Sequence, residues 1–381
     1  MNSLFLEPEH ELLRDQIRRF IVEDIKPYGE QWEKDGMVPR EVLRKMGELG
    51  FFGIRYPEEY GGANLDTRAT AIWAEELGMS TFSGVAVTAL VHTDMASVHI
   101  YNAGSQTQKD KYMPDIIAGE KITAIAVSEP NAGSDVKGIQ TKAIRHGHDS
   151  YMLNGSKTFI TNGVHADLYC VATKTNADGS SSRGVTIFLV EKGTPGFSVT
   201  RQLDKHGWRS SDTAELSFND CIVPAENILG EEDRGFYSIM ENFQNERIVI
   251  GAMAVGESQA AIDLTVEYAK TRKAFGAPLW EKQAIRQRLS MLSARVEAAR
   301  QLVYATAYRD SLGEQVVKEV SMIKALCGEL VNEVMYDCLQ FHGGSGYMVG
   351  MPIERMTRDA RVASIGGGAT EVMLEEIAKR I

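Results

Sequence analysis

The spacing of apolar residues changes character twice along this chain of 381 residues. Over residues 8–117 apolar side chains recur every three or four positions, which is the period of an amphipathic helix. Residues 121–226 instead favour short strands rich in Val, Ile, Thr and Tyr. From Gly235 onwards long helical periods return. The order of helices, sheet and helices predicts a mostly α protein with a central β domain.

A chain of this length exceeds one ordinary hydrophobic core, so two or three domains are expected. We place an N-terminal helical domain at 1–120, a middle β domain at 121–232 and a C-terminal helical bundle at 233–381. Within the middle domain Asn154-Gly155 predicts a hairpin turn between strands at 151–153 and 157–160. Further strands are expected at 186–190 and 214–218, and loops at 56–62 and 176–183.

The charge balance and the apolar runs exclude several classes of protein. Forty-one basic against fifty-two acidic side chains give a net charge of −11, which disfavours non-specific nucleic-acid binding. No uninterrupted apolar run approaches the roughly 18 residues that span a bilayer, so no membrane segment is expected. Residues 1–13 lack a basic region and a small-residue cleavage site, so we expect a cytoplasmic protein without a signal peptide.

Metal and nucleotide signatures are absent from the sequence. The four cysteines, Cys170, Cys221, Cys327 and Cys338, lie far apart without a CxxC pair, which argues against a zinc cage or a disulfide framework. His342 before two glycines is more typical of a helix C-terminus than of a metal ligand. No metal site is therefore expected. The sequence also lacks the motifs GxGxxG, GxxxxGK[ST], GxSxG and HExxH.

Glu246 is the sharpest single candidate for chemistry. A helix over 236–269 would place its carboxylate on the same face as the apolar side chains of Ile239, Phe243 and Ile250. Burial disfavours the charged form and raises the pKa of a carboxyl group, which suits a general base. The pattern alone also allows a structural glutamate paired with Arg247.

Three glycine-rich or polar segments have both a functional and a structural interpretation. Ser128-Glu-Pro-Asn-Ala-Gly-Ser-Asp135 and Asn154-Gly-Ser-Lys-Thr-Phe-Ile-Thr-Asn-Gly163 supply backbone donors where a phosphate or flavin could bind, or form only a polar loop and a hairpin. Ser364-Ile-Gly-Gly-Gly-Ala-Thr-Glu371 precedes a helix predicted at 372–379, where backbone can approach a ligand closely or simply turn.

Together with Thr271-Arg-Lys-Ala-Phe-Gly276 and Gln340-Phe-His-Gly-Gly344, these segments resemble the acyl-CoA dehydrogenase family over nearly the whole chain, especially its long-chain, isovaleryl and citronellyl-type members. The resemblance implies FAD bound between the β domain and the C-terminal four-helix bundle. The implied cofactor-binding residues are Val127, Ser128, Gly133, Ser134, Phe159 and Thr161, then Arg272, Phe275 and Gln283 from a neighbouring subunit, with Gln340, Gly344 and Glu371.

The implied reaction is α,β-dehydrogenation of an acyl-CoA thioester, in which a carboxylate takes the α-proton and flavin accepts the β-hydride. Many members carry the base just before a C-terminal Gly-Thr, where this chain has Gly367. Glu246 matches the alternative base of the subgroup, and we expect the Gly367 N–H to bind the thioester oxygen. Ser134, Phe243 and Arg247 are the other implied substrate-binding residues.

Two positions depart from the family pattern: Ala369 replaces a threonine, and Gln244 replaces an aspartate that often meets the pantetheine. The resemblance further implies a long-chain or branched acyl group lying near residues 88–95. It implies electron-transfer flavoprotein as acceptor, a homotetramer and a role in fatty acid β-oxidation. Two alternatives remain open, a flavin oxidase or monooxygenase of the same fold and a non-catalytic CoA-binding helical protein.

Overall fold

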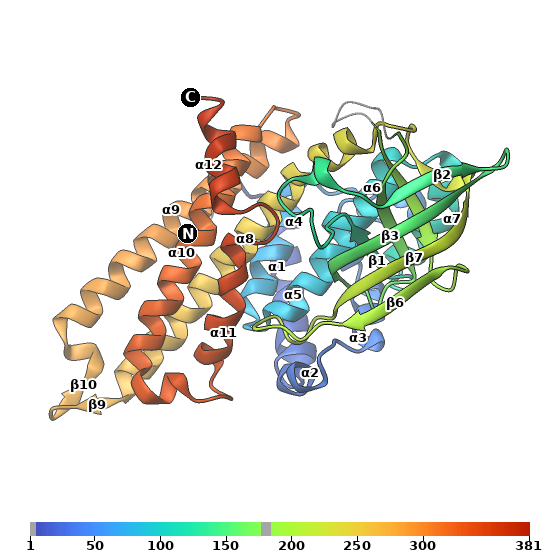
Figure 1. Cartoon of the computed structure of the whole chain (residues 1–381). Helices are drawn as coiled ribbons and strands as arrows, with labels where there is room; N and C mark the ends of the chain where they lie inside the picture. The colour runs from blue at the N-terminus through green and yellow to red at the C-terminus, as the bar shows by residue number, and fades with distance from the viewer. Residues whose placement is uncertain (1–4, 177–183) are drawn as a thin grey trace.

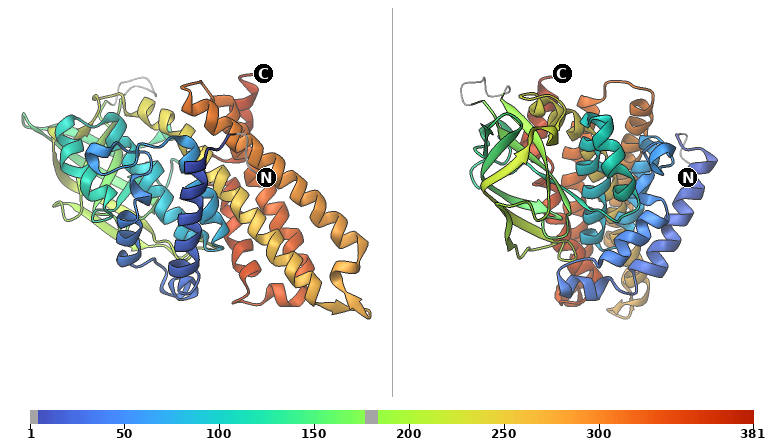
Figure 2. Two further views of the ribbon diagram at one scale, coloured as in Figure 1. Left: turned by 180° about the vertical axis from the view of Figure 1, so that it is seen from behind. Right: turned by 90° about the vertical axis from the view of Figure 1, so that its right-hand side faces the viewer.

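The structure is a computed structural model that describes residues 5–176 and 184–381. The predicted loop at 176–183 lies outside the described residues except for Asn176. Figures 1 and 2 show a helical part and a twisted sheet side by side, with the long C-terminal helices on the far side of the N-terminal helices from the sheet.

The N-terminal part consists of short helices, as the apolar spacing predicts. These are α1 (Pro8–Phe20), α2 (Gly29–Asp35), α3 (Arg40–Glu48), α4 (Thr67–Met79), α5 (Ser83–Leu90), α6 (Ser97–Ala103) and α7 (Gln106–Ile117). The predicted loop at 56–62 contains only the short 3₁₀ turn η3 (Glu58–Tyr60). Two π-helical segments, η1 (Ile21–Ile25) and η4 (Val91–Ala96), were not predicted.

The middle part is one sheet in the order β6-β7-β3-β2-β4-β5-β8, with β1 parallel to β4 (Figure 1). Its strands are β1 (Thr123–Ala126), β2 (Lys142–His146), β3 (Ser150–Thr161), β4 (Leu168–Lys174), β5 (Val185–Glu191), β6 (Phe197–Gln202), β7 (Thr213–Pro224) and β8 (Ile228–Leu229). The strands predicted at 186–190 and 214–218 fall within β5 and β7.

The hairpin predicted at Asn154-Gly155 is wrong, because β3 runs straight through these residues. Its register against β7 shifts between Leu153 and Gly155, as in a β-bulge. Gly155 has φ +149, and a Cβ there would lie 2.6 Å from Thr141 Oγ1, so glycine is needed for close approach rather than for a turn. The true hairpin joins β2 to β3.

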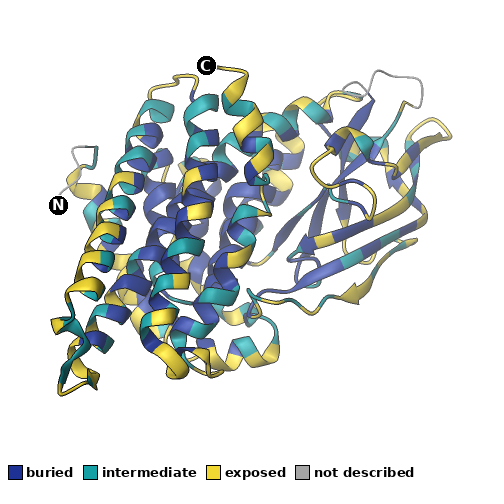
Figure 3. Ribbon diagram, turned by 60° about the vertical axis from the view of Figure 1, so that its left-hand side comes forward, coloured by how far each residue is buried: buried dark blue, intermediate teal, exposed yellow. Residues whose placement is uncertain are grey.

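The C-terminal part is built on long helices, whose middle turns are buried while their ends at the hairpin are exposed (Figure 3). The helices are α8 (Gly235–Thr271), α9 (Gln283–Ser311), α10 (Val317–His342), α11 (Pro352–Ala360) and α12 (Thr370–Ala378). A two-stranded hairpin, β9 (Lys273–Ala274) and β10 (Ala277–Pro278), joins α8 to α9. His342 ends α10, as predicted, and the helix expected at 372–379 begins two residues earlier.

Helix α8 lies at the centre of the molecule and crosses α4 without intervening side chains. A Cβ on Gly78 would lie 2.3 Å from Met253 O, and one on Gly256 would lie 2.0 Å from Glu75 O. By its length and composition alone α8 could cross a membrane. The requirement for an uninterrupted apolar run did not reveal this, because polar residues interrupt the helix. However, 83% of its most apolar window is buried inside the fold, as in the core helix of a soluble protein.

Candidate active site

Glu246 lies in the buried part of α8, with only 6% of its surface exposed. Its Oε1 accepts a hydrogen bond from Asn242 Nδ2 at 3.2 Å, one helical turn earlier. Burial raises the pKa of Glu246 to about 8, while Asn242 and Arg247 partly oppose the shift. A carboxyl group that titrates near neutrality is suited to taking up a proton in a catalytic cycle.

Arg247, the alternative partner in the sequence, forms no ion pair with Glu246 among the described residues. Its guanidinium lies 5.8 Å from the centre of the Phe243 ring, and its Nε is buried without a hydrogen-bond partner. Burial lowers the pKa of Arg247 below its usual value. An unpaired buried donor of this kind fits a site that receives a polar ligand.

The glycine segment at 366–368 packs against the same turn of α8. A Cβ on Gly367 would lie 2.4 Å from Ile250 Cδ1, and one on Gly368 would lie 3.9 Å from Arg247 Nε. Gly367 has φ +63, a left-handed conformation that side chains disfavour. The structure thus brings Gly367 to within one turn of Glu246, and the Gly367 N–H has no backbone acceptor in the described chain.

Lys324 on α10 holds this glycine segment in place. Its Nζ donates to Ala363 O at 2.6 Å and to Gly368 O at 2.9 Å, and the side chain is buried. Burial lowers the pKa of Lys324 to about 8. Lys324 is not among the predicted site residues, although a lysine on the apolar face of a helix is itself a signal.

The loop after β1 reaches α8 from the other side. Val127 of this loop and Phe243 of α8 both pack against the same apolar cluster, which joins the first predicted flavin residue to the core that the Glu246 helix also contacts. The backbone of Ser128 accepts a hydrogen bond from Thr158 N at 3.0 Å, which joins this loop to β3. The Val127 carbonyl accepts from Lys157 Nζ at 3.0 Å.

Two further predicted residues lie at the end of β3. Phe159 is 70% exposed and has φ +60, while Thr161 is half-buried. An exposed aromatic ring on a left-handed backbone is unfavourable unless a ligand uses it. Gly133 and Ser134 are exposed in the loop that follows Ser128, and a Cβ on Gly133 would meet nothing within 4 Å.

The remaining predicted cofactor residues lie elsewhere. Five exposed residues lie near the β9–β10 hairpin, where α8 and α10 end and α9 begins: Arg272, Phe275, Gln283, Gln340 and Gly344. We call them the hairpin-end set. Figures 1 and 2 show that hairpin far from the sheet. Phe275 is 98% exposed with φ +52. One chain therefore does not bring this set to Val127 and Phe159.

Glu371 is exposed in the first turn of α12, apart from both the residues around Phe159 and the hairpin-end set. Gln244 is half-buried on α8, and Ala369 directly precedes α12. No group of three or more metal-ligating side chains occurs in the part of the chain that the structure describes.

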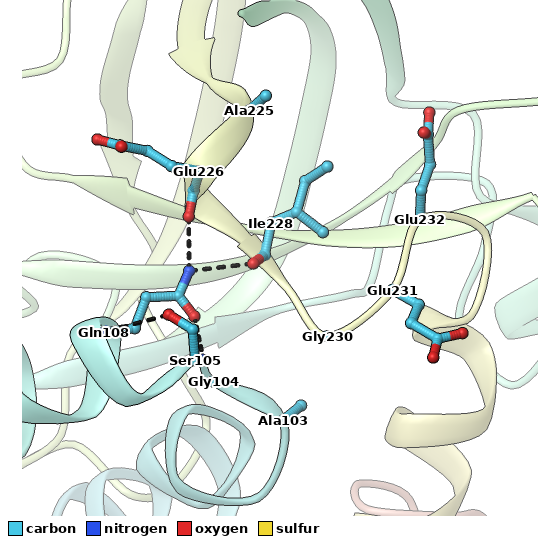
Figure 4. A pocket seen from close by; sticks show the side chains of 10 residues that line it. All are labelled: Ala103, Gly104, Ser105, Gln108, Ala225, Glu226, Ile228, Gly230, Glu231 and Glu232. Atoms are coloured by element: carbon cyan, nitrogen blue, oxygen red, sulfur yellow. Dashed lines mark hydrogen bonds between the residues drawn. The ribbon is translucent and has the colours of Figure 1, made fainter.

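A separate cavity of about 610 Å³ lies between the start of α7 and the segment around β8 (Figure 4). Gln108 Nε2 donates to Glu226 O at 2.8 Å and to Ile228 O at 3.0 Å, and Ser105 caps α7. Its polar groups thus serve the fold, and it shares no residue with the predicted site.

Comparison with known proteins decides between these interpretations. Three acyl-CoA dehydrogenase domain families match the sequence: the N-terminal domain at residues 7–120, the middle domain at 124–221 and the C-terminal domain at 233–381. The chain belongs to the acyl-CoA dehydrogenase family.

Individual relatives agree with the predicted subgroup. The mouse long-chain specific acyl-CoA dehydrogenase is 40% identical over 98% of this chain and 86% of its own. The isovaleryl-CoA dehydrogenase of Pongo abelii is 38% identical over 96% of this chain and 87% of its own. The crystal structure of an acyl-CoA dehydrogenase from Geobacillus kaustophilus superposes with a TM-score of 0.95, at 40% identity, over 100% of this chain and 99% of that one.

This acyl-CoA dehydrogenase is therefore an FAD-dependent oxidoreductase, and FAD complexes occur among the solved structures with its fold. The residues present fit the cofactor. Exposed Phe159 on a left-handed backbone and the open space above Gly133 offer a face to a flat ring system.

Proposed function

We propose that this enzyme dehydrogenates a long-chain or branched acyl-CoA to the trans-2-enoyl-CoA, with Glu246 as the base. The observation that carries the proposal is a buried glutamate with a raised pKa one helical turn from Gly367. Gly367 has no side chain that could take a proton. A carboxylate must therefore come from elsewhere in this pocket, and α8 supplies one.

Glu246 takes the α-proton from the thioester and becomes a neutral carboxylic acid. Because burial already favours its neutral form, this transfer is easier than to a carboxylate in water. FAD, when bound, supplies the oxidant that accepts the hydride from the β-carbon. The two electrons and both hydrogens of the broken C–H bonds are then accounted for.

The negative charge that develops on the thioester oxygen needs a donor. The Gly367 N–H is free of backbone acceptors in the described chain, and Lys324 fixes the segment that carries it. A donor that is already in position stabilises the enolate without reorganisation. Arg247, Phe243 and Ser134 are proposed to bind the rest of the thioester.

The acyl group is proposed to extend toward the end of α5 and into η4, which packs on α8 beside Glu246. Thr88 and Met95 of this region are buried, and the Thr88 hydroxyl oxygen has no hydrogen-bond partner among the described residues. The names of the mouse and Pongo abelii relatives support long or branched acyl groups.

A second subunit is proposed to complete the cofactor site, in a homotetramer. The hairpin-end set is exposed, and Figure 1 shows the β9–β10 hairpin far from the sheet of the same chain, so this set could reach the flavin site only of a neighbouring copy. We propose electron-transfer flavoprotein as the acceptor; the name of one solved structure at 36% identity refers to such a protein.

An anaerobic titration of the FAD-loaded protein with straight and branched acyl-CoAs tests the proposal. We expect one class to bleach the oxidised flavin absorbance and to yield the enoyl-CoA. No bleaching with any thioester, while dithionite still reduces the flavin, would contradict it. Rapid reoxidation by oxygen with formation of peroxide would indicate an oxidase instead.

A further inference from the structure

Asn242 connects the glutamate to the neighbouring π-helical segment. Its Nδ2 lies 3.2 Å from Glu246 Oε1, 3.2 Å from Met95 O and 3.5 Å from Asp94 O. The side chain is 5% exposed, so these contacts are shielded from water. Asn242 and Glu246 are four residues apart on α8 and therefore share one face of the helix.

The orientation of this amide follows from its neighbours. The three atoms that Asn242 Nδ2 contacts are all acceptors: two are carbonyl oxygens and one is a carboxylate oxygen. Only the NH₂ end of an amide can satisfy them. The two N–H groups are thus directed at Met95 O and at Glu246, while Oδ1 has no partner in the described chain.

Asn245 forms a similar link that does not include the glutamate. Its Nδ2 donates to Asp94 O at 2.9 Å and to Asp94 Oδ1 at 3.3 Å. Both asparagines therefore tie α8 to η4, a kind of segment that often occurs at functional sites. Only Asn242 also reaches Glu246.

We propose that Asn242 is a positioning residue that holds the Glu246 carboxylate in its ionised form, aligned with the segment that receives the acyl group. This inference rests on the proposed role of Glu246 as the base. An N–H directed at a carboxylate stabilises the anion, so Asn242 limits how far burial raises the pKa of Glu246. Without it, less of the base would be ionised at neutral pH.

None of the other charged and titratable groups described around this part of α8 donates a hydrogen bond to Glu246. In the described chain Asn242 is the one residue that donates to it. The surrounding groups are Arg247 on α8, Asp94 with its partner Arg55 on the η4 side, His99 on α6, Lys324 on α10, and Glu376 and Arg380 on α12.

The test compares Asn242→Ala with Asn245→Ala, which loosens the same segment without touching the base. For Asn242→Ala we expect the acid limb of kcat/KM against pH to move up by about one unit, since one unit corresponds to one lost hydrogen bond to a charged group. Asn245→Ala should leave the limb in place. Asn242→Gln, which keeps the amide donor, should restore part of the shift.

A second readout does not depend on turnover. The infrared C=O band of the protonated Glu246 side chain is identified as the band that disappears in Glu246→Gln. Its pH titration should show the same upward shift of the pKa in Asn242→Ala. The inference would be overturned if folded Asn242→Ala kept both the acid limb of kcat/KM and the infrared pKa of the wild-type enzyme. Equal shifts in Asn242→Ala and Asn245→Ala would overturn it too. Full activity of Glu246→Gln would instead overturn the proposed base, which is a separate outcome.

Discussion

Helix α8 carries two buried glutamates about three turns apart on one face, which share burial and a raised pKa but differ in their neighbours. Glu246 and Glu257 are 6% and 1% exposed, and burial raises the pKa of each to about 8. Glu246 has the Asn242 donor and the glycine segment beside it. Glu257 has no such donor on its own helix, and only the Ser83 hydroxyl opposes the effect of burial on the pKa of Glu257.

A raised pKa therefore does not identify the base by itself. Glu257 lies beside the closely packed crossing of α4 and α8 at Gly256, where backbone meets backbone and no substrate could enter. Glu246 lies where η4 meets α8 through Asn242, one helical turn from the contact between Gly367 and Ile250. The two carboxyl groups thus differ in the segments that surround them, and substitutions at each position separate their roles.

The largest expected effect is on turnover in Glu246→Gln. Removing a general base should lower kcat by about 10² to 10⁴, whereas Glu257→Gln should retain kcat within about twofold because it meets no substrate. Steady-state rates with the acyl-CoA that bleaches the flavin provide the measurement, with FAD content as the control. Equal losses in both variants would erase the distinction.

A smaller loss is expected for Gly367→Ala. The added methyl group must displace the Ile250 side chain, and an alanine in this left-handed conformation costs about 1–2 kcal/mol. We expect the backbone to shift in response and to turn the N–H away from the substrate. We expect kcat/KM to fall roughly tenfold. Gly366→Ala is the matched control, since its Cβ would meet only Val362 at 3.6 Å or more. An unchanged kcat/KM in Gly367→Ala would remove Gly367 from the account.

Lys324→Met should act on the same segment indirectly. Two carbonyls lose a charged donor, so we expect the free energy of unfolding to fall by about 2 kcal/mol and kcat/KM to fall several-fold. Asn332→Ala, which frees Ala360 O on the same side of α10, should lower stability without the loss of kcat/KM. A similar kinetic loss in both variants would point to general loosening.

The smallest effect concerns the pH dependence of stability. Both glutamates have native pKa values near 8, above their usual value of 4.5, so the folded state binds more protons between these limits. Stability is therefore lost as the pH rises from about 5 to 8. Glu246→Gln and Glu257→Gln should each flatten this slope in thermal melts to a similar extent. A flattened slope in one variant only would show that the two sites are not equally buried.

Much of the fold follows from the sequence because periodicity records burial directly. The long helical periods after Gly235, the position of Glu246 on α8 and the order of the three parts were predicted from spacing. The hairpin at Asn154-Gly155 was not, since a bulge glycine and a turn glycine look alike until the partner strand is known.

For the site, the sequence predicted some residues and missed others. Glu246 and Gly367 converge as expected, because a family resemblance locates residues that local pattern leaves ambiguous. Lys324 and Asn242 were missed, since their partners are backbone carbonyls or come from distant segments. The hairpin-end set could not be connected to the flavin residues, because one chain does not bring them together (Figure 1).

Exchange of the α-hydrogen is the sharpest test of Glu246 as the base. Each FAD-loaded variant is incubated anaerobically with the active acyl-CoA in D₂O, and loss of the α-C–H signal is followed by NMR. The wild-type enzyme and Glu257→Gln should exchange the α-hydrogen, and Glu246→Gln should not. Exchange by Glu246→Gln at the wild-type rate would contradict the assignment of Glu246 as the base.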